Sequence, residues 1–431
     1  GITRHLDYIR YLGFDAIWIS PVYHNYLGAY HGYHATDFNR IDPHWGSLDD
    51  LRELVDQAHA RGMRVIVDVV FNHLARLLTS DDPGFSGYSE TPYTLRWQND
   101  TDRFAPPFDD LSLFHAHGSI QDWEHPVQSV LGDLRGLADL KTEDPRVRDW
   151  LVEMHLALIA ATDVDGFRVD TAHHVDLASW QAIIPRIRDG ATALGKTNFL
   201  VFAESLRHRD DLVAPLTREG GFTSALYYPY FFTLQEIWGR RGPTRLIRER
   251  WSHRADYGSA ADLLVTFGDN HDRERLLNTR YLDGDTGRLK ALLSMLYASP
   301  GIPCFYYGTE QEFSGGKGHY AREPMFNPAV PGPTDVLDAA APIAQWARKL
   351  NLMRRMYPVL QSGATTVLFA ENAPGLFAFT RRSPDSLCVV VINNSTEARD
   401  LDAAWFEDGT GPDMKSGWID LTSDEKTPVR R

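Results

Sequence analysis

This 431-residue sequence has little cysteine, no long apolar run and no excess of basic residues. With only two cysteines, Cys304 and Cys388, a framework of disulfide bonds cannot be the basis of the fold. No run of about 18 apolar residues occurs, so we expect no membrane-spanning helix. The formal net charge of −14 argues against nucleic acid or an anionic membrane surface as the main partner.

The sequence does contain enough apolar surface for a large core. Hydrophobic residues make up 43% of it and charged residues 24%, which excludes disorder for the bulk of the chain. Aromatic residues reach 12%. Flat aromatic faces suit sugar rings, although aromatic side chains more often fill cores. No charged segment followed by an apolar stretch opens the chain, so we expect either no signal peptide or one that lies upstream, which leaves a secreted and a cytoplasmic location both open. The sequence predicts no oligomeric state.

Short apolar runs alternate with segments of helical periodicity along most of the chain. Residues 64–70 (RVIVDVV) are apolar on both faces, as strands of a parallel sheet are. Residues 48–61 have helical spacing, with Ser47 as the expected N-cap and Gly62 just past the end. Strands are expected at residues 16–20, 64–70, 166–170, 199–204, 225–229, 263–268 and 302–308. Further helices are expected at residues 6–12, 146–161 and 289–297 and from residue 178 onward, and residues 22–46, rich in Tyr, His and Gly, are expected to form a loop.

This alternation predicts an α/β protein with a parallel sheet, and a closed (β/α)8 TIM barrel is the best candidate. The sequence supplies seven such strands, so we expect the first strand of the barrel to be missing from this chain and to lie upstream. We expect the barrel at residues 1–73 and 145–358. A Pro-, Gly- and Asp-rich inserted subdomain is expected after the third strand, at residues 74–144. Period-two strands predict a short C-terminal antiparallel β-sandwich at residues 359–431.

Four of the expected strands end in polar residues. In a barrel these ends meet at one rim, so three carboxylates, an arginine and two histidines are expected to face a common point. Each group taken alone is more often a cap or a loop hydrogen-bonder, and the adjacent His173 and His174 should point opposite ways, which disfavours zinc. It is the ordered set that favours a catalytic site. The segments are residues 68–73 (DVVFNH), 166–174 (GFRVDTAHH), 202–205 (FAES) and 268–272 (GDNHD).

The chemistry of this set is that of sugar cleavage. Arg168 and Asp170 are two residues apart on one strand, so both point to the same face. A guanidinium beside a carboxylate favours its ionised form, whereas Glu204 is expected among acids, which would raise its pKa and keep it protonated. An ionised carboxylate opposite a protonated one is the pair that a retaining glycosidase needs. Asp272 is expected to stabilise the positive charge that develops on the sugar.

Together with four other segments in the same order, these segments resemble the α-amylase family of glycoside hydrolases, the clan that includes amylases, neopullulanases and cyclodextrin glucanotransferases. The other four are residues 13–21 (GFDAIWISP), 30–33 (YHGY), 137–140 (LADL) and 301–311 (GIPCFYYGTEQ). The resemblance covers nearly all of the chain. It implies the fold of the family, which is an eight-fold barrel, this insert and a C-terminal sandwich.

The resemblance also implies a role for each residue that matches a catalytic position. Asp170 would be the nucleophile and Glu204 the general acid/base. Asp272 would be the third carboxylate, which stabilises the transition state, and Arg168 would orient the nucleophile. These roles describe a retaining hydrolase that acts through a covalent glycosyl-enzyme intermediate.

Substrate contacts follow from the same resemblance. His73 and His271 would hydrogen-bond the sugar that is cleaved, and Tyr33 would stack beneath it. Thr171 follows the nucleophile, as in the relatives that cut α-1,4 links. The implied substrate is therefore a starch-like α-1,4-glucan or a maltooligosaccharide.

Structural Ca²⁺ is the one cofactor that the resemblance implies. Asn72, Asp139 and the backbone carbonyl of His174 match the calcium ligands of the family, which tie the insert to the barrel. Oxygen ligands from three loops suit a hard cation.

Residues at three positions leave alternatives open. His173 replaces a lysine that contacts the leaving-group sugar in the family, so the resemblance implies no chain-length preference. Arg135 and Leu206 stand where cyclodextrin-forming relatives have aromatic rings, so water is the favoured acceptor. A 4-α-glucanotransferase acting at the same site remains an alternative. A non-catalytic carbohydrate-binding relative is disfavoured because all three acids are present.

Overall fold

The computed structural model describes residues 1–82, 84–325 and 337–401. The chain divides into two compact units that interleave in sequence. The first unit consists of residues 1–10, 14–226 and 256–261, and the second of residues 11–13, 227–255 and 262–431. Among the described residues, none of the helices has the length and apolar content that a membrane span requires.

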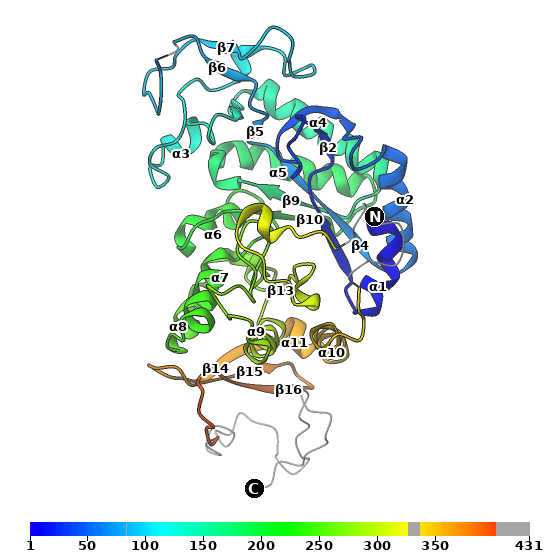
Figure 1. The fold of residues 1–431 in the computed structure, drawn as a ribbon, viewed down its shortest axis with the longest axis vertical. Coiled ribbons are helices and arrows are strands. Elements are labelled where there is room, and N and C mark those ends of the chain that lie inside the picture. The colour runs from blue at the N-terminus through cyan, green and yellow to red at the C-terminus, as the bar shows by residue number, and fades with distance from the viewer. Residues whose placement is uncertain (83, 326–336, 402–431) are drawn as a thin grey trace. The chain divides into compact units, whose positions relative to one another are not determined.

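The first unit is built on a parallel sheet with the strand order β1-β4-β9-β10-β11 (Figure 1). The register pairs Asp68 of β4 with Arg168 of β9, and Val70 with Asp170. Polar side chains at the ends of neighbouring strands are therefore brought level with one another. The strands are β1 (Ala16–Ile19), β4 (Arg64–Val70), β9 (Gly166–Asp170), β10 (Leu200–Ala203) and β11 (Ser224–Ala225).

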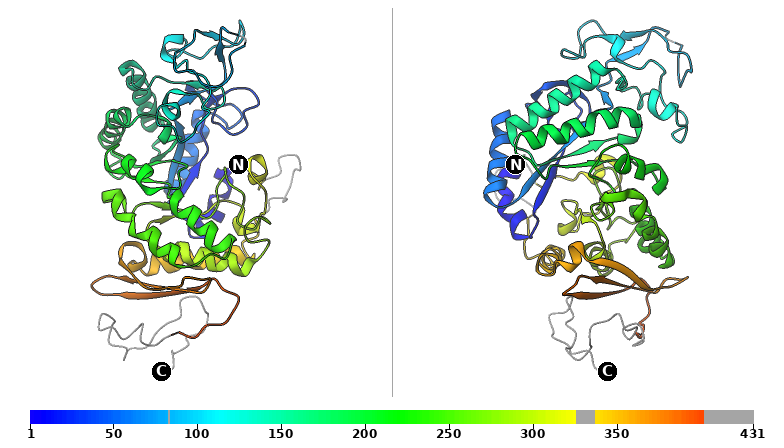
Figure 2. Two further views of the ribbon diagram at one scale, coloured as in Figure 1. Left: turned by 90° about the vertical axis from the view of Figure 1, so that its left-hand side faces the viewer. Right: turned by 180° about the vertical axis from the view of Figure 1, so that it is seen from behind.

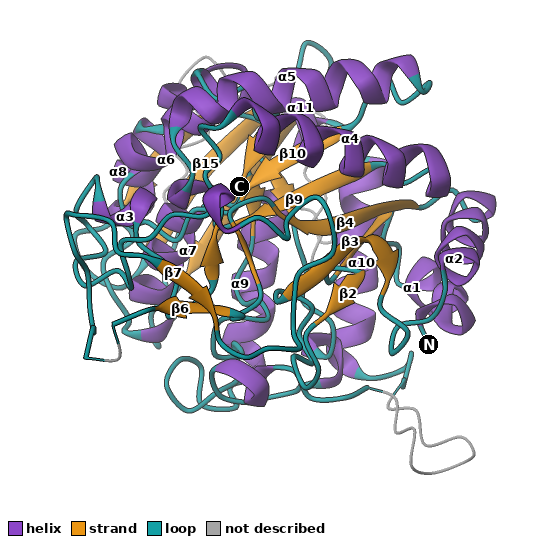
Figure 3. Ribbon diagram, turned by 90° about the horizontal axis from the view of Figure 1, so that it is seen from above, coloured by secondary structure: helices purple, strands orange, loops and turns teal. Residues whose placement is uncertain are grey.

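Helices α2 (Leu48–Ala60), α4 (Pro145–Thr162) and α5 (Leu177–Ala193) run along one side of β4, β9 and β10 (Figure 3). The expected N-cap of α2 is confirmed. The Ser47 side chain accepts a hydrogen bond from the Asp50 backbone N–H, and the Asp50 side chain accepts one from the Ser47 backbone N–H. Such a reciprocal cap satisfies two backbone donors that the helix leaves open. Two further helices are α1 (Leu6–Tyr11), after a 3₁₀ turn at Ile2–His5, and α6 (Asp210–Arg218).

The insert is closed at its base by its own two ends. Strand β5 (His73–Leu74) pairs antiparallel with β8 (Ala138–Asp139), so His73 becomes the neighbour of Asp139 and Leu74 that of Ala138 although they are far apart in sequence. Beyond this pair the insert extends past the end of the sheet as the cyan segment of Figure 2. Its other elements are β6 (Leu78–Ser80), β7 (Leu95–Trp97), a 3₁₀ turn at Leu111–Leu113 and α3 (Gln128–Leu131).

The second unit contains a parallel pair, β12 (Val265–Thr266) and β13 (Ile302–Pro303). Its helices are α7 (Tyr228–Leu234), α8 (Arg245–Ser252), α9 (Thr286–Ala298), α10 (Pro342–Met356) and α11 (Val359–Ser362). A π-helical turn at Gln235–Gly239 continues α7, and shorter 3₁₀ turns lie at Thr309–Gln311 and Gly318–Ala321.

An antiparallel sheet follows in the same unit, formed by β14 (Ala364–Ala370), β15 (Leu376–Arg382) and β16 (Leu387–Asn393). The fully buried Arg381 of β15 donates to the backbone carbonyls of Ala298 and Gly363, which ties the sheet to α9 and α11. The predicted β-sandwich needs a second sheet. The described residues contain one sheet of this domain, and residues 402–431 lie outside them.

Three expectations about elements were wrong. The strand predicted at residues 225–229 ends at Ala225, and Pro229 lies in the first turn of α7, where a missing N–H costs nothing. The strand predicted at residues 302–308 ends at Pro303. Residues 22–46, interpreted as loop, contain the hairpin β2 (Tyr23–Asn25) and β3 (Ala35–Ile41). Register shifts within this hairpin break the alternation that would have revealed it.

Candidate active site

A single buried arginine gathers the acids of the first unit. The Arg168 Nη1 atom donates to Asp170 Oδ1 at 2.6 Å and to the two carboxylate oxygens of Asp68 at 2.9 and 3.1 Å. Its Nη2 atom lies 3.7 Å from Glu204 Oε2. Burial disfavours the charged guanidinium, but the carboxylates, led by Asp68, outweigh burial and raise the pKa of Arg168. One cation therefore faces three carboxylates from three neighbouring strands.

Glu204 is held by the turn that follows β9. The Thr171 backbone N–H donates to Glu204 Oε2 at 2.8 Å, and the Ala172 N–H donates to the Glu204 carbonyl at 2.8 Å. Thr171 adopts a left-handed conformation, with φ 48° and ψ 36°. The Glu204 carboxylate thus faces the Arg168 guanidinium and a peptide N–H as well as the acids expected around it.

Asp68 belongs to this cluster, although no role was predicted for it from the sequence. Its fully buried carboxylate accepts from the Tyr33 hydroxyl at 2.7 Å and from the Trp18 indole N–H at 3.2 Å, in addition to Arg168. It thus fixes Tyr33 and Arg168 relative to each other. A signal was present in the sequence, since an aspartate inside the apolar run RVIVDVV must find donors on a neighbouring strand.

His73 presents an unsatisfied donor. Its Nδ1 atom lies 3.3 Å from the Asn72 side-chain nitrogen, so the ring accepts there and carries its hydrogen on Nε2. That Nε2 atom is buried and has no hydrogen-bond partner within the part of the chain that the structure describes. Burial lowers the pKa of His73 to about 4, which keeps the ring neutral. A buried donor without a partner is the expected state of a group that binds a ligand hydroxyl.

Two of the three expected calcium ligands are in contact. The Asn72 side chain donates to Asp139 Oδ1 at 2.9 Å, and His115 Nδ1 lies 2.7 Å from Asp139 Oδ2. Burial raises the pKa of Asp139 to about 6. The third residue, His174, places its ring Nδ1 2.7 Å from the Ser129 carbonyl.

The expected calcium ligands are an amide, a carboxylate and a backbone carbonyl, all of which supply the oxygen atoms that a hard cation prefers. The His115 ring already gives this carboxylate a positive neighbour, because its hydrogen bonds to Asp139 and Glu143 outweigh burial and raise the pKa of His115 to about 9. Among the described residues no group of three or more His, Cys, Asp or Glu side chains is arranged to hold a metal ion, and the expected set contains only one such side chain, Asp139.

Asp272 and His271 lie in the second unit. The His271 Nε2 atom is 2.9 Å from Asp272 Oδ2, and Arg322 Nη2 is 3.4 Å from Asp272 Oδ1. Within that unit Asp272 is half-exposed and has a positively charged neighbour in Arg322.

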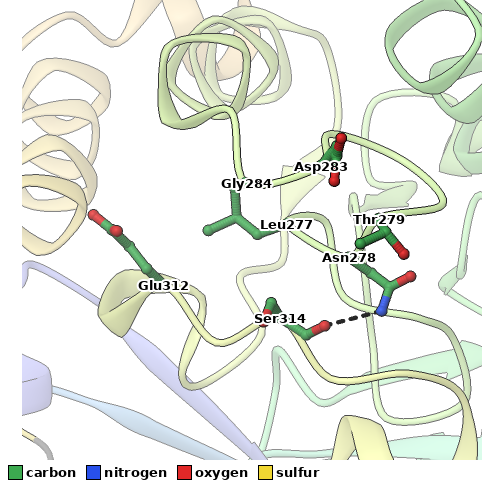
Figure 4. A pocket seen from close by; sticks show the side chains of 7 residues that line it. All are labelled: Leu277, Asn278, Thr279, Asp283, Gly284, Glu312 and Ser314. Atoms are coloured by element: carbon green, nitrogen blue, oxygen red, sulfur yellow. Dashed lines mark hydrogen bonds between the residues drawn. The ribbon is translucent and has the colours of Figure 1, made fainter.

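A polar pocket of about 340 Å³ also lies in the second unit (Figure 4). Glu312 lies on one side of it, and Asn278, Thr279 and Asp283 lie on the other. No predicted site residue and no aromatic ring lines this pocket, so it is not the expected sugar site. Its lining residues are Leu277, Asn278, Thr279, Asp283, Gly284, Glu312 and Ser314.

Comparison with known proteins gives consistent matches over almost the whole chain. The model of the α-amylase catalytic domain matches residues 1–329. A beta/alpha-amylase of Paenibacillus polymyxa is 33% identical over 408 residues, which cover 92% of this chain and 30% of that protein. An α-amylase of Streptomyces lividans is 28% identical over 465 residues, which cover 92% of this chain and 50% of that protein. The chain thus spans half or less of the length of these two relatives.

Solved structures agree with the sequence matches. The α-amylase of Geobacillus thermoleovorans, in a complex with acarbose, has a TM-score of 0.76 and 30% identity, covering 92% of this chain and 80% of that one. A cyclomaltodextrin glucanotransferase with a three-domain arrangement has a TM-score of 0.75 and 27% identity, covering 91% of this chain and 78% of that one.

Proposed function

Because this chain belongs to the α-amylase family of glycoside hydrolases, we propose that it cleaves α-1,4-glucosidic bonds of starch-like glucans or maltooligosaccharides with retention of configuration. The observation that carries the proposal is the buried Arg168 guanidinium, which lies 2.6 Å from Asp170 and 3.7 Å from Glu204. It holds two acids from neighbouring strands at one end of a parallel sheet. Carboxylates at such strand ends are the usual site of chemistry in barrel enzymes.

The fold of its family is a (β/α)8 barrel with a C-terminal domain, and the described residues of this chain contain seven parallel strands, β1, β4, β9, β10, β11, β12 and β13. We assign the barrel to residues 1–73 and 145–358, the inserted subdomain to residues 74–144 and a β-sandwich to residues 359–431. The pairing of β5 with β8 at the base of the insert supports the first two assignments. The antiparallel sheet β14–β16 supports the third.

In the proposed reaction Asp170 attacks the anomeric carbon while Glu204 protonates the departing glycosidic oxygen. A covalent glycosyl ester on Asp170 results, and Glu204 then takes a proton from the water that hydrolyses it. Arg168 supports the first step because its guanidinium holds one of the Asp170 carboxylate oxygens in place. The Thr171 N–H fixes Glu204 Oε2.

Substrate binding is assigned to the residues around these acids. The unpartnered Nε2–H of His73 is a donor for a sugar hydroxyl, and the Tyr33 ring, fixed through its hydroxyl by Asp68, is a stacking surface. From the second unit, Asp272 is assigned the stabilisation of the transition state and His271 a hydrogen bond to the same sugar. The His271–Asp272 contact at 2.9 Å supports treating these two as one element of the site.

The test of this proposal is the loss of turnover in Glu204→Gln. General acid catalysis contributes about 10²–10⁴-fold, so hydrolysis of soluble starch and maltotriose should fall by that range. Glu90→Gln, which alters an exposed carboxylate of the insert, is the control and should leave turnover unchanged. Near wild-type turnover in Glu204→Gln would refute the assignment.

A transglycosylase acting at the same site is the second candidate, because cyclomaltodextrin glucanotransferases are among the similar structures. The covalent intermediate is the same, and only the acceptor differs. Early products from maltotriose decide between the two: shorter sugars alone indicate transfer to water, whereas longer or cyclic products indicate transfer to sugar.

We also propose a structural calcium ion, held by the side chains of Asn72 and Asp139 and the backbone carbonyl of His174. The contact of the first two residues at 2.9 Å and the burial of the Asp139 carboxylate support this assignment. The ion would stabilise the base of the insert, where β5 meets β8.

A further inference from the structure

The docking segment of the insert, defined as residues 123–131, contacts both of the turns that hold Glu204. This segment contains α3 and is separated in sequence from Glu204 by more than 70 residues. It contacts the 3₁₀ turn Ala172–His174 after β9 and the loop that follows β10. Two specific polar contacts make these connections.

The first contact reaches Glu204 through Thr171. The His174 ring donates from Nδ1 to the Ser129 carbonyl of the docking segment at 2.7 Å. The His174 backbone N–H closes the turn onto the Thr171 carbonyl at 2.9 Å, and the Thr171 N–H holds Glu204 Oε2 at 2.8 Å. Thr171 is a β-branched residue in the left-handed region, a strained conformation that persists only where its surroundings determine it.

The second contact reaches Glu204 through its own loop. Arg207 lies three residues after Glu204, and its Nη1 atom donates to Glu124 Oε1 of the docking segment at 2.7 Å. Arg207 is only 9% exposed, whereas the Glu124 side chain is 72% exposed. A surface carboxylate is thus the ionic partner of an almost buried guanidinium. The short loop from Glu204 to Arg207 is tightened by the Arg207 N–H, which donates to the Ser205 carbonyl at 2.8 Å.

We infer that the docking segment positions the acid/base through these two contacts, with Arg207 and Glu124 as positioning residues. The inference rests on the proposed role of Glu204. The insert would then do more than cover the site, because its attachment fixes the carboxyl that protonates the leaving group. General acid catalysis requires that carboxyl within hydrogen-bond reach of the departing oxygen, so a loosened attachment reduces proton transfer before it reduces binding.

The test compares two substrates that differ in their need for a proton. Maltotetraose has a poor leaving group, whose glycosidic oxygen must be protonated as it departs. An aryl α-maltoside made from an acidic phenol releases its phenolate without protonation. In Glu124→Gln, kcat/KM on maltotetraose should fall by about 10-fold and that on the aryl maltoside by less than about 2-fold, with the loss in kcat rather than KM. Glu124 is exposed, so this variant should fold, and its melting temperature is measured as a check.

Arg207 variants complete the experiment. Arg207→Met should show the same selective loss, and Arg207→Lys should recover part of the activity on maltotetraose. The double variant Glu124→Gln/Arg207→Met should lose no more than Arg207→Met alone, because both changes break one contact. Glu90→Gln is the control for an exposed charge of the insert.

An equal loss on both substrates, or no loss on either, would overturn the inference. Either result would not affect the proposed function, because the wild-type protein would still hydrolyse both substrates. If the wild-type protein hydrolyses neither substrate, the proposed function fails and the positioning role fails with it.

Discussion

At the scale of single residues, Asp68 shows what the sequence could and could not predict. The pattern of the strands predicted Arg168 and Asp170 on one face of β9, and the structure brings Glu204 to the same guanidinium. Nothing in one sequence says that Asp68 on the neighbouring strand accepts from Arg168, Tyr33 and Trp18. That fact depends on the register between β4 and β9, which the local pattern does not encode.

The substitution Asp68→Asn keeps the shape but removes the charge that opposes Arg168. We expect the free energy of unfolding to fall by on the order of 3 kcal/mol, because a buried guanidinium loses a buried partner. Glucan hydrolysis should fall as well, since Tyr33 and Arg168 lose their common anchor. Urea denaturation and starch assays measure the two effects.

The matched control is Asp15→Asn, which breaks an ion pair with Arg10 in which the aspartate side chain is 68% exposed. Exposed pairs contribute about 0–1 kcal/mol, so this variant should match the wild type within that range. If Asp68→Asn behaved like Asp15→Asn, the buried network around Arg168 would not have the importance assigned to it.

At the scale of elements, the sequence predicted best where a helix or strand carries its own signals. The cap of α2 and the apolar strand β4 are examples, because both depend on nearest neighbours in sequence. The prediction failed at the aromatic segment before Phe231, where strand propensity was overruled by a helix that begins at Tyr228 and is buried on most sides. The β5–β8 pair at the base of the insert was also missed, because its two strands are far apart in sequence.

The packing of α4 against the sheet predicts a pH dependence of stability. His155 of α4 is fully buried and stacks on Phe71 with a ring-centroid distance of 4.1 Å. Of the aromatic rings that contact it, that of Tyr23 is titratable. Burial lowers the pKa of His155 to about 4, below the value near 6.5 of an unfolded chain. The unfolded state therefore binds more protons between these values, and stability falls as the pH drops through that window.

From pH 7 to pH 5 this single group should remove about 2 kcal/mol from the free energy of unfolding. In His155→Phe the stacking on Phe71 remains possible while the titration is gone, so the loss between pH 7 and pH 5 should be smaller by about that amount. Denaturant titrations at both pH values measure the difference. His253→Gln, at an exposed position, is the control, and an identical pH dependence in His155→Phe and wild type would contradict this explanation.

At the scale of the whole molecule, the order of the segments carried most of the information. Eight short motifs in sequence predicted the family, and the family model matches residues 1–329. Individual strands such as β11 and β13 are too short to be predicted with their bounds, since their two residues depend on partners elsewhere in the chain. The three carboxylates are divided between the units, with Asp170 and Glu204 in the first and Asp272 in the second.

The proposed calcium ion predicts that chelation destabilises the protein. A cation that binds only the folded state stabilises it by mass action, so adding a chelator should lower the melting temperature and adding calcium should restore it. Asp139→Asn should lose this response, whereas Asp110→Asn, at an exposed position of the same insert, should keep it. An unchanged melting temperature in wild-type protein after chelation would contradict the calcium assignment.

The central claim is that Asp170 forms the covalent bond to the sugar with Glu204 as its acid/base. A maltosyl fluoride whose ring carries an additional fluorine forms the glycosyl-enzyme rapidly and hydrolyses it slowly. Mass spectrometry of the digested protein then locates the sugar. The account predicts loss of activity in step with one added maltosyl group on the peptide that contains Asp170. A sugar attached to any other residue, or inactivation without an attached sugar, would contradict it.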